Sequence, residues 1–302
     1  MMFGTREEFE YIECSGCGTI QIAAIPELSK YYPENYNPYK SAQLPFADKW
    51  MTRATARFAS RYFTGKTAPL GQLLVRKKKW TDDLFPLFLR EKLLDLRFDS
   101  RILDFGSGAG DLLNVLSFFG FKDLTGIDLY LPDDIQYDNG VEILKRKLSE
   151  LEPSYDLIMS HHSLEHVPDP LATLQQIKRL LRVGKFCLIR MPVISYAWEK
   201  YGGNWIQLDA PRHINLFTEG GFVSFAESIG FHVEKVIYDS TSFQFWGSEK
   251  YLRDIPLVDG DGRISNAMFD PAQLVEWEKE AQLLNHRAKG DQASFYLRKI
   301  VV

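Results

Sequence analysis

The sequence predicts an α/β protein with a mostly parallel sheet, and three observations carry this prediction. A short apolar strand at 101–105 runs into a turn of alternating glycines and then into a helical pattern at 111–119. A second short strand follows at 123–128, and a strand, a helix and a strand in this order favour parallel pairing. The same order recurs further along the chain. Its strands and helix are expected at 155–160, 169–181 and 185–191.

Composition bounds the kind of protein. With 302 residues, 45% of them hydrophobic and 25% charged, the chain can bury a large core. A formal net charge of -4 gives no overall attraction for nucleic acid, and no apolar run reaches the length of a membrane span. The three cysteines, Cys14, Cys17 and Cys187, form no disulfide framework, so we expect a protein of the reducing cytoplasm.

The glycine turn discriminates between nucleoside cofactors. A dinucleotide-binding turn has glycines spaced G-x-G-x-x-G around a pyrophosphate, whereas here Asp104 precedes Gly106, Gly108 and Gly110 in strict alternation. An acidic residue at this strand end repels phosphate but accepts hydrogen bonds from the loop or from a cationic ligand. At the end of the second strand, Asp128 stands where such sheets bind the two ribose hydroxyls.

This pairing of motifs resembles the cofactor site of class I S-adenosylmethionine-dependent methyltransferases. The resemblance implies a Rossmann-like, seven-stranded, mostly parallel sheet with helices on both faces, whose last strand lies between the fifth and sixth. It also implies S-adenosylmethionine as cofactor. The cofactor contacts expected from the resemblance are Asp104, Gly106, Ser107, Gly108, Gly110, Asp128, Leu129, Ser160 and His161.

A histidine-rich segment follows the strand at 155–160. Leu164-Glu165-His166-Val-Pro-Asp-Pro170 is similar to a segment that lies beside the methyl donor and the acceptor in the same family. His162 to His166 also matches the H-x-x-E-H pattern of zinc proteases, which requires a long helix. Pro168 and Pro170 prevent that helix, so we predict no metal site. A purely structural role for Glu165 and His166, in packing the loop, remains open.

The loop at 192–217 is rich in polar and aromatic residues and follows a strand end, so we expect it to cover the acceptor. Its Trp205-x-x-Leu-Asp-x-Pro-Arg-His213 stretch resembles a segment of bacterial methyltransferases of surface-glycan or secondary-metabolite pathways. Histidine suits proton removal near neutral pH, which makes His213 the first candidate for the base and His166 the second. The alternative is that Asp209, Arg212 and His213 only brace the loop. The residues expected to contact the acceptor are Tyr196, Trp205, Arg212 and His162.

The N-terminal part, residues 1–98, differs from the rest. The Cys14-x-x-Cys17 turn looks like one half of a zinc ribbon, but a second pair of ligands is missing, which favours a packed β-turn. Phe46, Trp50 and Ala54 recur at helical spacing and predict a helical region beside the cofactor.

We expect the methyltransferase domain over 99–302, with an insertion at about 240–289 that holds a tryptophan-bearing loop and a helix. The insertion is available to shape the acceptor site or to form a homodimer face. The predicted function is methyl transfer to an oxygen of a small molecule or sugar precursor. A non-catalytic cofactor-binding protein and a nicotinamide-dependent oxidoreductase are the alternatives.

Overall fold

The computed structural model describes residues 2, 4–32, 50–64, 69–260 and 262–300. The chain forms two compact units. The first consists of Met1–Pro33, His162–Leu174 and Ile189–Leu297, and the second of Glu34–His161, Gln175–Leu188 and Arg298–Val302. Among the described residues, no helix combines the length and the apolar character needed to cross a membrane.

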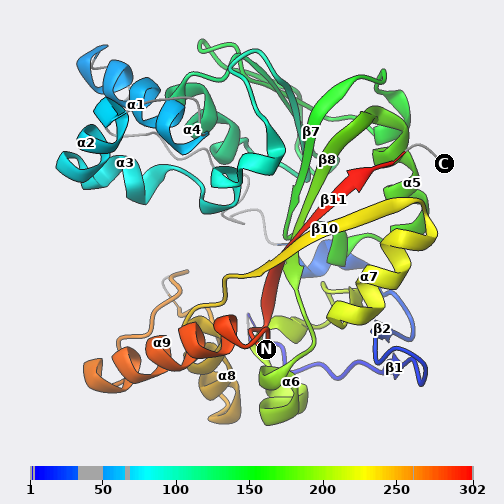
Figure 1. The fold of residues 1–302 in the computed structure, drawn as a ribbon. Coiled ribbons are helices and arrows are strands. Elements are labelled where there is room, and N and C mark those ends of the chain that lie inside the picture. Colours follow the sequence, from blue (N-terminus) through cyan, green and yellow to red (C-terminus); the bar gives the residue numbers. More distant parts are fainter. Residues whose placement is uncertain (1, 3, 33–49, 65–68, 261, 301–302) are drawn as a thin grey trace. The chain divides into compact units, whose positions relative to one another are not determined.

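An eight-stranded sheet is the main feature of the fold (Figure 1). Its strands are β3 (Arg101–Phe105), β4 (Asp123–Ile127), β5 (Ile135–Gln136), β6 (Glu142–Leu144), β7 (Tyr155–His161), β8 (Leu181–Pro192), β10 (Phe231–Tyr238) and β11 (Gln292–Lys299). The strand order β10-β11-β8-β7-β3-β4-β6-β5 confirms the expected fold class. The last strand, β11, lies between β8 and β10, which are the fifth and sixth strands of the predicted sheet. The eighth strand is the two-residue β5, which pairs antiparallel with β6 and is too short to be predicted from sequence.

Parallel pairing fixes the register around the glycine turn. Strand β3 lies between β4 and β7, with Phe105 opposite Ile127 on one side and Ser160 on the other. These strands are almost wholly buried because their side chains face helices or loops on both sides. Helix α4 (Asp111–Phe119) begins directly after Gly110 and buries Leu113, Leu116 and Phe119.

The described N-terminal part of the second unit is helical, as predicted. It contains α1 (Trp50–Phe63), α2 (Pro69–Lys77) and α3 (Lys79–Leu84), followed by the short helices η3 (Leu87–Arg90) and η4 (Lys92–Leu94). In α1 Trp50 is exposed, and the buried residues include Ala56, Ala59 and Phe63. Small alanines let α1 pack closely on α4. Phe46, which belonged to the predicted pattern, lies outside the described residues.

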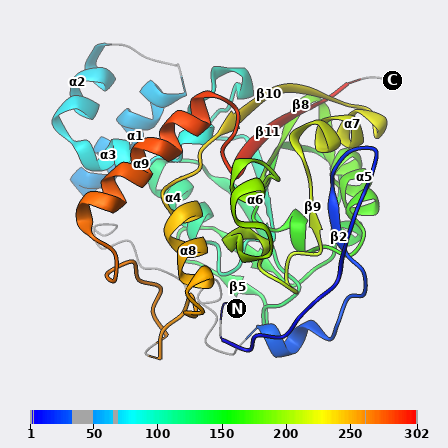
Figure 2. The same cartoon turned by 90° about the horizontal axis from the view of Figure 1, so that it is seen from below.

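The first unit holds a small antiparallel sheet of β1 (Tyr11–Glu13), β2 (Ile20–Ile22) and β9 (Asn215–Leu216), seen in Figure 2. The Cys-x-x-Cys turn joins β1 to β2, where the Cys14 carbonyl accepts a hydrogen bond from the Gly18 amide at 2.8 Å. Cys14 and Cys17 are both exposed free thiols. The structure thus places a tight, exposed turn at this position, and its packing without a metal stays a prediction.

Short helices fill the rest of the first unit. They are η1 (Leu28–Tyr31), η6 (Leu164–His166), α6 (Tyr196–Tyr201), η7 (Gly202–Asn204), η8 (Ile206–Leu208), α7 (Glu219–Ser228), α8 (Phe243–Leu252) and α9 (Pro271–His286). Helix α5 (Pro170–Leu180) starts as predicted, with the Asp169 carboxylate accepting a hydrogen bond from the Ala172 amide at 2.9 Å.

Two predicted elements were wrong in the second half of the chain. The tryptophan-bearing loop of the insertion is helix α8, which buries Phe245, Ser248 and Tyr251 at helical spacing. Aromatic residues on its other faces conceal that period in the sequence. Strand β8 begins at Leu181 rather than at Lys185, because Gly184 adopts a positive φ of 76° within the strand and does not end the helix before it.

Candidate functional site

The glycine turn after β3 has the conformation that the sequence predicted. Gly106, Gly108 and Gly110 all have positive φ angles, of 72°, 53° and 84°. A Cβ atom on Gly110 would lie 2.4 Å from Cδ1 of Ile143, closer than packing allows. The turn therefore needs glycine both for its backbone conformation and for its close approach to β6.

Asp128 follows β4 and fixes the turn. Its Oδ2 accepts a hydrogen bond from the amide of Gly108 at 3.0 Å, and its Oδ1 accepts one from the amide of Tyr130 at 2.9 Å. The carboxylate is only partly buried, and the neighbouring Leu129 is 49% exposed. Asp128 is thus held in place by two backbone donors with the side chain still accessible, as a ribose-binding acid requires.

Replacing Asp128 with alanine is expected to weaken S-adenosylmethionine binding at least about tenfold, because a charged acceptor for the ribose hydroxyls is lost. Titration calorimetry measures this. Asp123→Ala, at the exposed start of the same strand, is the matched control and should leave the affinity unchanged. An unchanged dissociation constant for Asp128→Ala would remove the ribose assignment.

Asp104 is a buried acid at the centre of the second unit's site. Only 3% of the residue is exposed. Burial, and then the nearby negative charge of Asp128, raise the pKa of Asp104 to about 8. A cationic ligand stabilises the ionised form of such a group. The carboxyl and the bare glycine backbone together fit a cofactor that carries positive charge and no phosphate.

The end of β7 supplies the remaining predicted cofactor residues. Ser160 pairs with Phe105 in the sheet and is fully buried, and the ring of His161 lies 4.3 Å, centroid to centroid, from that of Phe88. The second unit therefore brings Asp104, the glycine turn, Asp128 and the end of β7 onto neighbouring strands. Ser107 lies within the turn, between two of the glycines. Its hydroxyl fills the space beside Gly126, where a Cβ atom would lie 2.4 Å from Oγ of Ser107.

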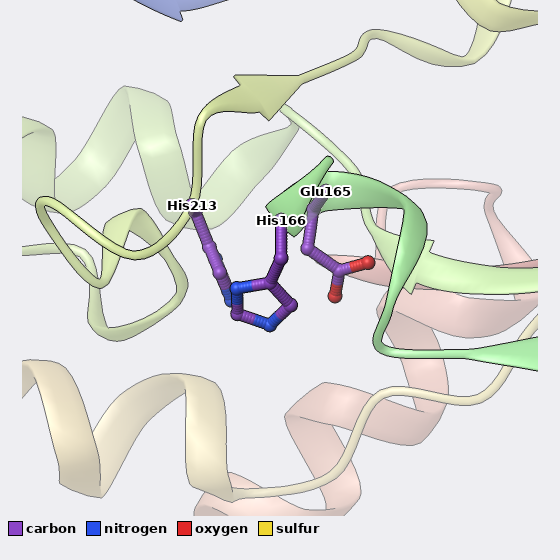
Figure 3. Close-up of side chains that lie close together, drawn as sticks. All are labelled: Glu165, His166 and His213. Atoms are coloured by element: carbon purple, nitrogen blue, oxygen red, sulfur yellow. The ribbon is translucent and has the colours of Figure 1, made fainter. Parts of the chain in front are cut away.

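Glu165, His166 and His213 come together in the first unit (Figure 3). Each residue has one side-chain nitrogen or oxygen atom that lies within 4.8 Å of the corresponding atoms of the other two. Glu165 and His166 belong to the short helix η6, and His213 comes from the loop before β9. The structure thus brings together both candidate bases, and it adds Glu165, for which the sequence left a packing role open.

The hydrogen bonds of the two imidazoles determine which nitrogen carries the proton. Nδ1 of His166 lies 2.9 Å from the Arg212 carbonyl oxygen, and Nδ1 of His213 lies 2.6 Å from that of Gln207. A carbonyl only accepts, so each Nδ1 donates and each Nε2 presents a lone pair. Burial lowers the pKa of both histidines to about 4, so both are neutral at physiological pH.

A chain of contacts leads outward from Glu165. Nδ1 of His162 lies 3.3 Å from Oε1 of Glu165, and Nη1 of Arg190 donates to Nε2 of His162 at 2.8 Å. Arg190 in turn pairs with Asp239 at 2.6 Å. Burial alone would raise the pKa of Glu165, but its contact with His162 and its other histidine neighbours lower the pKa below its ordinary value. The sequence did not identify Arg190 or Asp239, since neither belongs to a motif.

The predicted acceptor residues are mostly engaged in the protein itself. The Arg212 guanidinium pairs with Asp209 and is 5% exposed, which supports a role in bracing the loop. Trp205 has no exposed surface, and its indole N–H donates to Asp291 at 3.0 Å. Trp205 is thus a core residue of the first unit, and its role in stacking on the acceptor stays a prediction. Tyr196 is partly buried, with its hydroxyl 3.3 Å from Glu280.

A family model described as a methyltransferase domain matches residues 71–236, which is more than half of the chain. The protein belongs to this methyltransferase family. It is a class I methyltransferase that uses S-adenosylmethionine, in agreement with the glycine turn, Asp104 and Asp128. The nicotinamide-dependent alternative is thereby excluded.

The methyltransferase also resembles named proteins. Two of them are ubiquinone biosynthesis O-methyltransferases. The one from Paraburkholderia phymatum is 28% identical over 54% of this chain and 71% of its own length. The one from Paracidovorax citrulli is 32% identical over 38% and 49%, so the match spans about half of that relative.

Among solved structures, an S-adenosylmethionine-dependent methyltransferase from Archaeoglobus fulgidus is 15% identical. It covers 76% of this chain and 94% of its own, with a TM-score of 0.41. Another from Mesorhizobium loti is also 15% identical, with coverages of 67% and 91% and a TM-score of 0.42.

Proposed function

We propose that the protein transfers a methyl group from S-adenosylmethionine to a hydroxyl oxygen of a small molecule, such as a phenol or a sugar precursor. The observation that carries this proposal is the pair of neutral imidazoles, His166 and His213, whose Nε2 atoms are free to accept a proton. A hydroxyl must lose its proton to become a good nucleophile, and a positioned base supplies that step. The names of the related O-methyltransferases support oxygen as the methylated atom.

In this proposal the bound cofactor supplies an electrophilic methyl group. The acceptor hydroxyl would hydrogen-bond to Nε2 of His213, which would take its proton as the oxygen forms the new bond to carbon. The bond between that carbon and the sulfonium sulfur would break in the same step, leaving S-adenosylhomocysteine. The Gln207 carbonyl keeps Nδ1 protonated, so the imidazole accepts the proton only at Nε2. The buried carboxylate of Glu165 then stabilises the imidazolium by its charge.

A cavity in the first unit has the size of a small-molecule site. Its volume is about 560 Å³, within the range typical of such pockets, and it is lined in part by Phe9, Tyr11, Leu208 and Asp209. The Tyr11 hydroxyl donates to the carbonyl of His213 at 2.9 Å, so the cavity adjoins the histidine segment. The mixture of rings and carboxylates favours a hydroxylated, ring-containing acceptor.

The cysteines and the insertion bear on the compartment and the assembly of the enzyme. We place it in the cytoplasm because Cys14, Cys17 and Cys187 are all free thiols. The helices of the insertion, α8 and α9, are the proposed face of a homodimer.

Turnover measurements with a panel of phenols, catechols and sugars test the function, with production of S-adenosylhomocysteine as the readout. His213→Gln is expected to reduce turnover at least about tenfold while the cofactor affinity stays the same, because the proton acceptor is lost. His232→Gln, which replaces a half-exposed histidine on β10, is the control and should keep full turnover. Normal turnover of His213→Gln would exclude that residue as the base, and no methylation of any hydroxyl acceptor would refute the proposal.

A further inference from the structure

We propose that Glu165, His166 and His213 form a binding site for a Zn²⁺-type divalent metal ion, with a coordination position left for the acceptor oxygen. The ligand set is two imidazole nitrogens and one carboxylate, which is the composition of many catalytic zinc sites. Only the role of the open position rests on the proposed function. The sequence predicted no metal site, because H-x-x-E-H was assessed as a single helix and His213 lies in another segment.

The three side chains already point toward one another (Figure 3), with their donor atoms within 4.8 Å. Ligand atoms around tetrahedral zinc are separated by about 3.3 Å, given bond lengths near 2.0–2.1 Å. The separations between the ligand atoms therefore need to shorten by up to about 1.5 Å for the three residues to share one ion. All three residues belong to the same compact unit.

Both imidazoles are oriented as metal ligands are. A ligating histidine usually donates its second N–H to a carbonyl or carboxylate, which fixes the ring and leaves the other nitrogen for the metal. Here the Arg212 carbonyl accepts from His166 at 2.9 Å, and the Gln207 carbonyl accepts from His213 at 2.6 Å. The Nε2 atom of each ring is consequently left for a metal ion, and the carboxylate of Asp209 lies 3.7 Å from that of His213.

Glu165 supplies an independent observation. The residue has no exposed surface, and neither carboxylate oxygen accepts a hydrogen bond from the part of the chain that the structure describes. Its nearest charged or polar contact is Nδ1 of His162 at 3.3 Å, which is outside good hydrogen-bond geometry. A fully buried carboxylate whose two oxygens accept no hydrogen bond has lone pairs left over, and a cation between it and the imidazoles would use them.

Nitrogen donors distinguish the expected metal. Two imidazoles suit Zn²⁺, Co²⁺ or Fe²⁺, whereas Mg²⁺ and Ca²⁺ prefer oxygen donors throughout. His162 is not a ligand, because its Nε2 accepts from Arg190 at 2.8 Å, and it serves to position Glu165. In the metal-bound protein Nε2 of His213 is a ligand and no longer accepts a proton. An acceptor hydroxyl bound at the open position would instead lose its proton more easily through the metal ion, as metal-bound water does.

Co²⁺ titration of the untagged, metal-free protein tests the site without any turnover. The protein carries Cys14→Ser and Cys17→Ser, which removes the exposed thiols as competing ligands. We expect one Co²⁺ per chain, with the visible absorption of a four- or five-coordinate site that Zn²⁺ abolishes. Glu165→Gln and His213→Gln should each weaken binding at least about tenfold. His232→Gln should have no effect.

Several outcomes would overturn the site. They are the absence of stoichiometric Co²⁺ binding, or binding that Glu165→Gln and His213→Gln leave unchanged. S-adenosylmethionine affinity and circular dichroism identify a variant that fails to fold, in which case His166→Gln takes its place. Turnover of a hydroxyl acceptor by metal-free protein would refute the metal's role and leave the proposed function standing. Metal binding without turnover of any hydroxyl acceptor would refute the proposed function and leave the metal site standing.

Discussion

The affinity for S-adenosylmethionine is expected to rise on the order of 50-fold between about pH 6 and pH 8, through ionisation of Asp104. Burial and the charge of Asp128 raise the pKa of Asp104 to about 8, so its carboxyl is protonated in the free protein at neutral pH. The cofactor is a cation and favours the carboxylate, so binding releases a proton. Raising the pH removes the free-energy cost of releasing the proton, and the gain in affinity levels off above about pH 8.

The raised pKa of Asp104 also makes the stability of the free protein depend on pH, but in the opposite direction. Because the pKa of Asp104 is higher in the folded than in the unfolded state, its contribution to stability is complete below about pH 4. That contribution is lost as the pH rises toward 8. Cofactor binding and folding therefore respond in opposite directions to a rise in pH.

Titration calorimetry at pH 6, 7 and 8, in buffers of different ionisation enthalpy, measures both the affinity and the protons released. Asp104→Asn is the matched variant, because it keeps the size and polarity of the side chain and cannot ionise. Its affinity should be independent of pH over this range. Equal affinities of the native protein at pH 6 and pH 8, with no proton release, would contradict the assignment of Asp104.

The cofactor half of the site could be predicted because its signals are local. Alternating glycines after a short strand specify a turn with positive φ, and Asp128 follows the next strand. Parallel strands that neighbour one another then bring these residues together without further information. The predicted sheet order held for the same reason, since each strand was separately identifiable.

The cluster of Glu165, His166 and His213 could be predicted only in part. Both histidines were candidates, but the groups that orient them are the carbonyl oxygens of Arg212 and Gln207, and backbone carbonyls leave no trace in a sequence. Arg190 and Asp239 reach Glu165 only through His162, so no motif contains them. Glu165 itself was taken for a packing residue because its lack of hydrogen-bond partners is a property of the fold.

The complete burial of Trp205 could not be predicted, for a related reason. A tryptophan among glycines and polar residues suggests an exposed loop, but burial depends on what packs over it. Here the core of the first unit includes residues of β2, α6, α8 and α9. Trp198 contacts its ring edge-on, with the ring centroids 6.2 Å apart. The partners of Trp205 come from four separate segments, which periodicity cannot reveal.

Replacing Trp205 with alanine is therefore expected to lower the free energy of unfolding by about 3–5 kcal/mol. The side chain is completely buried, so its removal loses apolar burial and leaves a cavity in the core of the first unit. Denaturant unfolding followed by circular dichroism measures the change. Trp50→Ala is the control, since Trp50 is 76% exposed and its loss should change stability by less than about 0.5 kcal/mol.

Trp205→Phe separates the ring from its hydrogen bond to Asp291. Burial raises the pKa of Asp291 to about 6, and the indole N–H partly opposes that rise by donating to the carboxylate. Without the donor, the ionised carboxylate is buried with less compensation, which should cost about 1–3 kcal/mol. The protonated carboxyl needs the donor less, so the deficit should be larger at pH 8 than at pH 5. A deficit that does not change with pH would show that Trp205 stabilises the fold by packing alone, because the charge on Asp291 would then have no part in it.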